Sequence, residues 1–440
     1  MGEQTMKLLI KNGTLVTPEG LKKADLLVED GNISAMASSL EETAEAEICD
    51  ATGLLVSPGL IDLHVHLREP GYEYKEDIAT GTRAAARGGF TAICCMANTN
   101  PVNDTTAVTA LIKMKAEREG IVHVHPIAAV TKGMKGEELT EMGELKEAGI
   151  VAVSDDGKSV LNPGRMRLAL SYARHFGLPV VSHPEDPDLV GNGIMNEGYW
   201  STVLGMPGIT RVAEESIIAR DCMLAELEGA HLHVAHVSTA GGAEIVRQFK
   251  AKGARITAET APHYLYATDA WVEGYDTNTR VNPPLRTEKD AEALIEALKD
   301  GTIDCIATDH APHHADEKNV EYALAATGIS GLETALGVCW TALVTPGHLT
   351  PAELLRKMTG APAEIFSLSG GTLEVGKDAD IVLIDPQSEW VVDVDEFASK
   401  GKNNPFNGKN LTGRVVKTFV KGRCVYELGN ASDLEGEKVR

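Results

Sequence analysis

Short runs of apolar and β-branched residues alternate with stretches of helical pattern through the middle of the chain. This alternation is typical of repeated β-α units around a parallel sheet. Eight apolar runs are candidate strands: 60–67, 90–97, 122–130, 150–156, 178–183, 231–237, 254–259 and 303–309. Helices are expected between them at 78–87, 107–119, 137–148, 165–176, 209–227, 240–251 and 289–298. Because eight β-α units close a barrel, the pattern predicts an α/β fold of the (β/α)8 TIM-barrel type.

The two ends of the chain carry a different pattern, in which glycine, proline and asparagine separate short apolar runs, as in antiparallel strands. Four runs precede the barrel and four follow it: 7–10, 14–17, 25–28, 46–49, 379–385, 389–394, 413–420 and 422–426. The 440 residues also exceed the size of about 250 to 300 residues at which single cores stop growing. We expect residues 1–57 and 370–440 to form one small β-sandwich domain beside a catalytic barrel of residues 58–369.

Composition and charge narrow the classes of function. Hydrophobic residues make up 43% and charged residues 24% of the chain, as in an ordinary globular protein. The formal net charge of -23 argues against general binding to nucleic acid or to an anionic membrane. The seven cysteines form no Cys-x-x-Cys pair, which fits a reducing compartment. With no apolar run of signal-peptide or membrane-span length, we expect a cytoplasmic protein.

Two histidines on the first predicted barrel strand are candidate metal ligands. Alternate residues of a strand point to the same side, so His64 and His66 would present two imidazoles to one point. Histidines two apart also occur in polar cores, and the same spacing recurs at His123 and His125 without obvious partners. This motif alone therefore leaves both interpretations open.

The ends of the other strands favour the metal interpretation. Barrel enzymes place their chemistry at the carboxyl ends of the strands. Ligand-type residues stand at four further predicted ends: Asp155 and Asp156 on the fourth strand, His183 on the fifth, His236 on the sixth and Asp309 on the eighth. So regular a placement predicts a metal site at the mouth of the barrel. Strand alternation does not choose between Asp155 and Asp156.

These motifs make the chain similar to the amidohydrolase superfamily and, within it, to the type I dihydroorotases. The resemblance covers nearly the whole chain and rests on residues 62–71, 96–101, 154–157, 282–286, 306–313 and 376–383. It implies two Zn²⁺ ions per subunit. The ligands of one would be His64, His66 and Asp309, and those of the other His183 and His236. Asp156 would bridge the two, where hydantoinase-like relatives usually carry a carboxylated lysine.

The implied reaction is the reversible cyclisation of N-carbamoyl-L-aspartate to L-dihydroorotate plus water, a step of pyrimidine biosynthesis. Two metal ions that share a water lower its pKa enough to hold hydroxide near neutral pH. That hydroxide would attack the ring carbonyl. Asp309 would take its proton and deliver it to the departing ring nitrogen.

The residue Arg68 indicates a carboxylated substrate. It lies on the same predicted strand face as the two histidines but further toward the mouth, and its planar fork suits a carboxylate. The resemblance adds five further substrate contacts: Asn98, Asn282, His313, Thr327 and Gly328. Of these, Thr327 departs from the residue expected in the family. Hydantoin and allantoin rings are neutral, so Arg68 favours dihydroorotase over allantoinase or hydantoinase activity.

The remaining predictions concern other histidines and partners. We expect His231 and His233 to be structural and His263 to be a candidate for orienting a metal ligand. An inactive scaffold relative is the alternative of another class, but such relatives typically lose ligands, and here every ligand position is filled. The resemblance implies a homodimer and association with aspartate transcarbamoylase as possible assemblies.

Overall fold

The computed structural model describes residues 7–430, and its centre is a closed barrel of parallel strands. The eight strands are β6 (Leu60–Val65), β7 (Phe90–Cys95), β8 (His123–Pro126), β9 (Val153–Ser154), β10 (Val180–Ser182), β13 (Leu232–Val234), β14 (Ile256–Thr260) and β15 (Cys305–Ile306). These strands form two sheets, one of β6, β7 and β8 and one of β9, β10, β13, β14 and β15. Two parallel bridges, Ala128 with Val153 and Val65 with His310, join the two sheets into a ring. The predicted (β/α)8 barrel is confirmed.

Most barrel strands are shorter than predicted because the chain leaves strand geometry where the polar residues begin. The first strand ends at Val65 rather than at residue 67, and the fourth keeps only Val153–Ser154. Arg68, His236 and Asp309 have φ angles of 60°, 37° and 48°, outside the β region. Of the six predicted metal ligands, His64 lies within its strand and the other five follow the strand ends by one to three residues.

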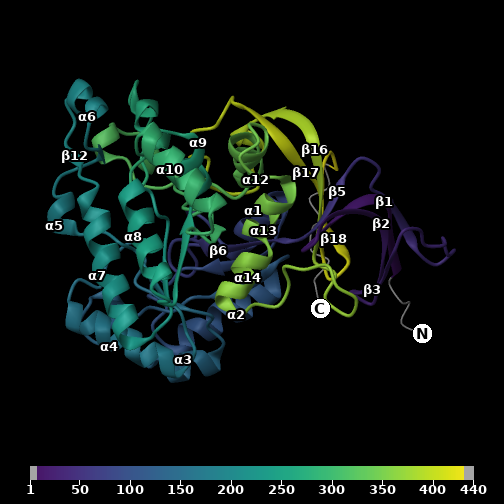
Figure 1. The fold of residues 1–440 in the computed structure, drawn as a ribbon, viewed down its shortest axis with the longest axis horizontal. Helices are drawn as coiled ribbons and strands as arrows, with labels where there is room; N and C mark the ends of the chain where they lie inside the picture. Colours follow the sequence, from purple (N-terminus) through teal and green to yellow (C-terminus); the bar gives the residue numbers. More distant parts are fainter. Residues whose placement is uncertain (1–6, 431–440) are drawn as a thin grey trace.

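The predicted helices surround the barrel (Figure 1). They are α1 (Ile78–Arg87), α2 (Thr106–Glu119), α3 (Met142–Ala148), α4 (Pro163–His175), α7 (Val212–Glu228), α8 (Ala240–Ala251) and α10 (Glu288–Lys299). Two of them start later than predicted. Residues 138 and 140 bond to the backbone of 132 and 130, which delays α3. Ile209 pairs with Asn196 between β12 (Gly208–Ile209) and β11 (Met195–Asn196), which delays α7.

Shorter helical elements complete the fold. The additional α-helices are α5 (Pro187–Val190), α6 (Tyr199–Leu204), α9 (Pro262–Tyr266), α11 (Ala315–Lys318), α12 (Ala335–Cys339), α13 (Pro351–Met358) and α14 (Gly360–Phe366). Short turns of other helix types are η1 (Lys132–Met134), η2 (Asp269–Val272), η3 (Thr277–Thr279), η4 (Tyr322–Leu324), η5 (Trp340–Val344) and η6 (Val394–Glu396). No helix within residues 7–430 has the length and apolar character needed to cross a membrane.

The two ends of the chain meet in one sheet, drawn in purple and yellow beside the barrel in Figure 1. Its strands are β1 (Lys7–Thr17), β2 (Gly20–Glu29), β3 (Asn32–Ala37), β4 (Glu47–Asp50), β5 (Leu55–Pro58), β16 (Ile381–Val391), β17 (Asn410–Val420) and β18 (Arg423–Glu427). The two flanks are joined where β16 pairs antiparallel with β5. The prediction that the flanks combine is thus confirmed, although β4 and β5 pair parallel with β1.

Bulges explain why some predicted runs are parts of one strand. The register of β1 shifts between Ile10 and Gly13, where Asn12 has a φ of 62°, so two predicted runs belong to one strand. The register of β16 shifts in the same way between Asp385 and Glu389. The side chains of this sheet form an apolar cluster, which includes Leu8, Ile10, Val56, Ile381 and Phe419 and is separate from the core of the barrel.

Candidate active site

The first cluster of predicted ligands joins the first and eighth barrel strands. His64 lies at the end of β6, His66 one residue beyond it, and Asp309 on the turn after β15. Asp309 Oδ1 is 3.1 Å from His66 Nε2 and 3.4 Å from His64 Nε2. All three side chains are buried.

The second cluster lies beside it, with Asp156 between the two. His183 and His236 follow β10 and β13, and His183 Nδ1 is 2.8 Å from His236 Nε2. Asp156 Oδ1 lies 3.3 Å from His64 Nε2, 3.5 Å from His183 Nδ1 and 3.8 Å from His236 Nε2. Its Oδ2 is 3.4 Å from His66 Nε2. The structure therefore brings all six predicted ligands together.

The neighbouring Asp155 points elsewhere, which decides the choice that strand alternation left open. Its carboxylate accepts hydrogen bonds from Thr131 N, at 3.0 Å, and from Thr131 Oγ1. Only Asp156 faces the histidines.

The geometry fits metal ions. Two ligands about 2.1 Å from a tetrahedral zinc ion lie about 3.4 Å apart, and the separations from Asp309 and Asp156 to the histidines are 3.1 to 3.8 Å. His64 Nε2 and Asp156 Oδ1 are buried and have no hydrogen-bond partner among the described residues. Such atoms are costly unless a ligand satisfies them. The site is thus built to receive cations.

Two side chains orient the histidines of the first strand. His64 Nδ1 donates to Glu259 Oε1 at 2.8 Å, and His66 Nδ1 donates to Asn98 Oδ1 at 2.9 Å. Each bond places the proton on Nδ1 and leaves the Nε2 lone pair free for a metal. The sequence analysis missed Glu259. Its signal was an acidic residue within the apolar strand β14, where Glu259 Oε2 also lies 3.0 Å from His233 Nε2.

The carboxylates of the cluster favour the binding of positive charge, as the pKa values of the neighbouring histidines show. Burial alone would lower the pKa of His64, but Asp156 and Asp309 raise it well above its ordinary value. Burial likewise opposes a charged His183, yet Asp156 and Glu185 raise its pKa to about 10. Burial would raise the pKa of Asp156, and His64 holds it well below its ordinary value. The two carboxylates therefore attract either protons or metal cations.

The candidate substrate residues Arg68 and His313 lie together beyond this cluster. Arg68 Nε donates to Pro312 O at 3.3 Å, and its Nη2 is 3.4 Å from His313 Nε2. His313 Nε2 is also 3.0 Å from Thr327 O, next to Gly328. We expected Arg68 on the same strand face as the two histidines. In the structure β6 ends at Val65, and Arg68 lies on the turn that follows it.

Asn282 lies on the other side, near the second histidine pair. Its Nδ2 donates to Glu185 Oε2 at 2.6 Å, and the same oxygen is 3.6 Å from His183 Nε2. Asn98 contacts the site through His66. His263 is buried, and its Nε2 has no hydrogen-bond partner within residues 7–430. That nitrogen therefore gives no support to the expectation that His263 orients a metal ligand. His231 Nε2 bonds Thr257 Oγ1 at 2.9 Å, as expected of a structural residue.

Comparison with known proteins agrees with this geometry. The family model described as dihydro-orotase-like matches residues 53–241, and that of the amidohydrolase family matches residues 224–426. Among solved structures, L-hydantoinase (dihydropyrimidinase) from Arthrobacter aurescens is similar, with a TM-score of 0.87 and 28% identity over 96% of both chains. Dihydropyrimidinase from Brevibacillus agri gives a TM-score of 0.85 and 27% identity over 96% of this chain and 95% of that one.

Curated relatives are more similar in sequence. A dihydroorotase of Syntrophotalea carbinolica is 55% identical over 97% of this chain and 100% of its own length. A dihydroorotase of Pelotomaculum thermopropionicum is 55% identical over 96% of this chain and 99% of its own. Similarity of this extent shows that the chain belongs to the dihydroorotases, cyclic amide hydrolases of the amidohydrolase superfamily.

Proposed function

We propose that this protein interconverts N-carbamoyl-L-aspartate and L-dihydroorotate plus water in pyrimidine biosynthesis. The observation that carries the proposal is the position of Arg68 beside His313, just outside a cluster of four histidines and two aspartates. A guanidinium at this place suits a ring that carries a carboxylate. The curated dihydroorotases, similar over nearly the full chain, support the same substrate.

Two zinc ions per subunit are part of this proposal. His64, His66 and Asp309 would hold one, His183 and His236 the other, and Asp156 both. When bound, the ions would polarise the ring carbonyl and lower the pKa of the attacking water. The ligand set of nitrogen and carboxylate oxygen suits zinc.

The chain's own residues would divide the remaining work. Asp309 would accept the proton of the attacking water and deliver it to the ring nitrogen that departs. Arg68, with Asn98 and His313, would bind the carboxylate and so orient the ring. Asn282 and the backbone at Thr327 and Gly328 would contact the ring. Because the aspartate at 309 both faces the histidines and lies at the mouth, it can serve both ends of the proton path.

Ring opening of L-dihydroorotate by the purified, zinc-loaded protein tests the proposal. We expect turnover in both directions, with zinc bound to the protein by elemental analysis. Absence of turnover, together with good turnover of hydantoin or allantoin, would overturn it.

A hydantoinase or dihydropyrimidinase is the second candidate, because the solved structures with TM-scores of 0.87 and 0.85 carry those names. Their identity to this chain is 28% and 27%, against 55% for the curated dihydroorotases. Neutral substrates also give Arg68 nothing to pair with. A scaffold without activity would instead give folded protein that binds no zinc.

Domain limits, assembly and location complete the proposal. The sheet domain would comprise residues 1–57 and 370–440, and the barrel domain residues 58–369. The family resemblance favours a homodimer and association with aspartate transcarbamoylase, which size-exclusion chromatography with and without that enzyme would test. All seven cysteines are free thiols, which suits a reducing, cytoplasmic location.

A further inference from the structure

A segment from the C-terminal part of the chain packs against loops at the mouth of the barrel. It comprises residues 397–404, between η6 and β17, and we call it the strap. Three of its side chains are almost fully buried: Ser399, Asn403 and Asn404 are 1%, 3% and 1% exposed. Burial of three polar side chains in a connecting segment requires bonding partners on the barrel.

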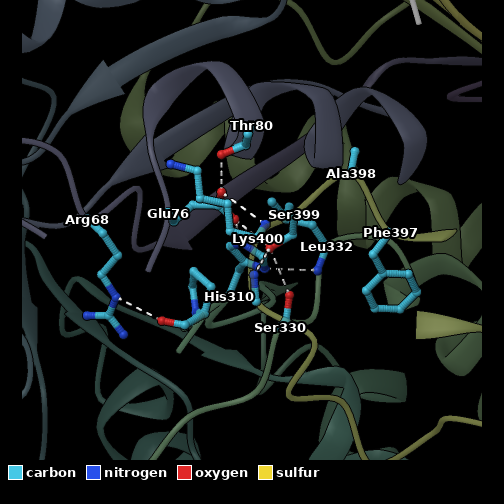
Figure 2. Close-up of polar contacts among 12 residues, drawn as sticks. Arg68, Glu76, Thr80, His310, Ser330, Leu332, Phe397, Ala398, Ser399 and Lys400 are labelled. Carbon is cyan, nitrogen blue, oxygen red and sulfur yellow. Dashed lines mark hydrogen bonds and ion pairs between the residues drawn. The ribbon is translucent and has the colours of Figure 1, made fainter. Parts of the chain in front are cut away.

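The first half of the strap is fixed to the barrel by charged residues. Ala398 N and Ser399 N donate to the carboxylate of Glu333 at 3.0 and 3.1 Å. Ser399 Oγ donates to Glu76, and Lys400 Nζ pairs with Asp77. Figure 2 shows Ser399, Lys400 and His310 gathered around Glu76. The strap is therefore anchored beside the loop that carries Arg68.

The second half reaches the loops that hold the proposed substrate contacts. Asn403 Oδ1 accepts a hydrogen bond from His313 N at 2.9 Å. Its Nδ2 donates to Ala311 O at 3.0 Å and to Gly328 O at 2.9 Å. All three side-chain bonds of Asn403 thus go to backbone atoms of two loops, the one after β15 and the one through Gly328.

These two loops approach each other closely at the point that Asn403 bridges. Gly328 has a φ of 151°, and a Cβ there would lie 2.6 Å from Ala311 O and 3.1 Å from the ring of His313. Only glycine permits this approach. Two carbonyl oxygens so placed need a shared donor, which the Asn403 amide supplies.

We propose that Asn403 is a positioning residue for substrate binding: its amide joins the two loops and so sets His313 and Gly328 at the distance that the carboxylated ring requires. The inference rests on the proposed function, because His313 and Gly328 are substrate contacts only there. A residue of the strap, which connects two strands of the terminal sheet, thereby acts in the substrate site of the barrel. Loss of the amide would leave the metal cluster intact, because none of the six proposed metal-binding residues forms a hydrogen bond with the side chain of Asn403.

The chain offers a matched control next to it. Asn404 is equally buried and also makes three side-chain bonds, to Ser330 O at 2.9 Å, Thr334 Oγ1 at 3.0 Å and Phe406 N at 2.8 Å. None of these partners is a proposed substrate contact. Asn403→Ala and Asn404→Ala therefore remove the same group from the same strap with different expected consequences.

The test measures KM and kcat for L-dihydroorotate, zinc content and Tm in both variants. We expect Asn403→Ala to raise KM about tenfold with kcat changed less than about threefold and zinc retained. Asn404→Ala should lower Tm by about as much as Asn403→Ala does, because both remove three hydrogen bonds, but it should leave KM within about twofold of the parent. Equal KM values for the two variants would overturn the inference. If Asn403→Ala does not fold, Asn403→Ser, which keeps one hydroxyl, gives the same comparison with a smaller rise.

His313→Ala separates this inference from the proposed function. A raised KM in that variant supports the substrate site, and Asn403 is then judged by its own comparison with Asn404. An unchanged KM in His313→Ala overturns the proposed carboxylate site and, with it, the role of Asn403.

Discussion

The metal cluster and the substrate wall, formed by Arg68, His313 and the backbone at Thr327, are positioned in different ways. The metal ligands stand at strand ends, and the histidines on the first strand are oriented by Glu259 and Asn98 of neighbouring barrel segments. The substrate wall stands on loops beyond the strands. Its neighbouring backbone is held by Asn403 of the strap, from outside the barrel.

The difference suggests which functions are rigid and which can vary. Ligands on a hydrogen-bonded barrel keep their geometry through the sheet itself. Loop residues need bonds from another part of the chain, and the loops of barrels are where specificity changes. A substitution in the cluster should affect turnover and metal, whereas one in the wall should affect substrate binding with the metal retained. The following predictions test this division.

Asp309→Asn should have the largest effect, a fall in kcat of about a thousandfold, because general acid-base groups contribute about 10² to 10⁴ in rate. The amide keeps an oxygen beside His66 but accepts no proton. Ring opening of dihydroorotate and zinc analysis check it, with Asp316→Asn, an exposed aspartate, as the matched control. Near-normal activity would remove Asp309 from the proton-transfer role.

Arg68→Lys should lower kcat/KM for dihydroorotate by about a hundredfold, chiefly through KM, because lysine cannot bind a carboxylate with two parallel bonds. Zinc content should not change. Any slow turnover of neutral hydantoin should be unaffected, which makes it the control reaction. An equal loss on both substrates would place Arg68 in the structure of the site rather than in carboxylate binding.

Glu259→Gln should weaken zinc binding about 10- to 100-fold, because it removes the carboxylate that orients His64. Competition with a chelator measures the affinity. Asp380→Asn is the matched control, since Asp380 pairs with His123 at 3.0 Å outside the proposed metal site. Similar zinc affinity in the two variants would contradict an orienting role for Glu259.

His231→Gln should have the smallest effect and should touch neither region. His231 precedes β13, whose other end leads to His236. Burial lowers the pKa of His231 to about 3, so the folded state keeps it neutral where the unfolded chain binds a proton. Stability is therefore lost as pH falls below about 6.5 toward 3.

Glutamine can keep the bond to Thr257 and does not titrate. From pH 7 to pH 5, the parent's free energy of unfolding should fall by about 2 kcal/mol more than that of His231→Gln. Urea unfolding at the two pH values measures it, and KM at pH 7 should be unchanged. Parallel falls in the two proteins would show that His231 is not the group responsible.

Much of the fold could be predicted because its signals are local. Apolar runs and their punctuation placed the eight barrel strands, and α1 and α8 match their predicted limits. The limits of α3 and α7 could not be predicted, because backbone pairing of residues 138–140 and of Ile209 competes with the helices. Bulges at Asn12 and in β16 likewise joined runs that the pattern separates.

The sequence by itself determined which ligand types stand at the strand ends, since strand order and side-chain chemistry are written along the chain. Strand alternation left Asp155 and Asp156 open and the family resemblance favoured Asp156; the tertiary structure supplies the physical reason, because Thr131 binds the carboxylate of Asp155. It alone revealed Glu259 behind His64, 195 residues away, and Asn403 beside Gly328, 75 residues away. Hydrogen bonds between such distant groups depend on where the folded backbone brings them, and no local pattern carries that information.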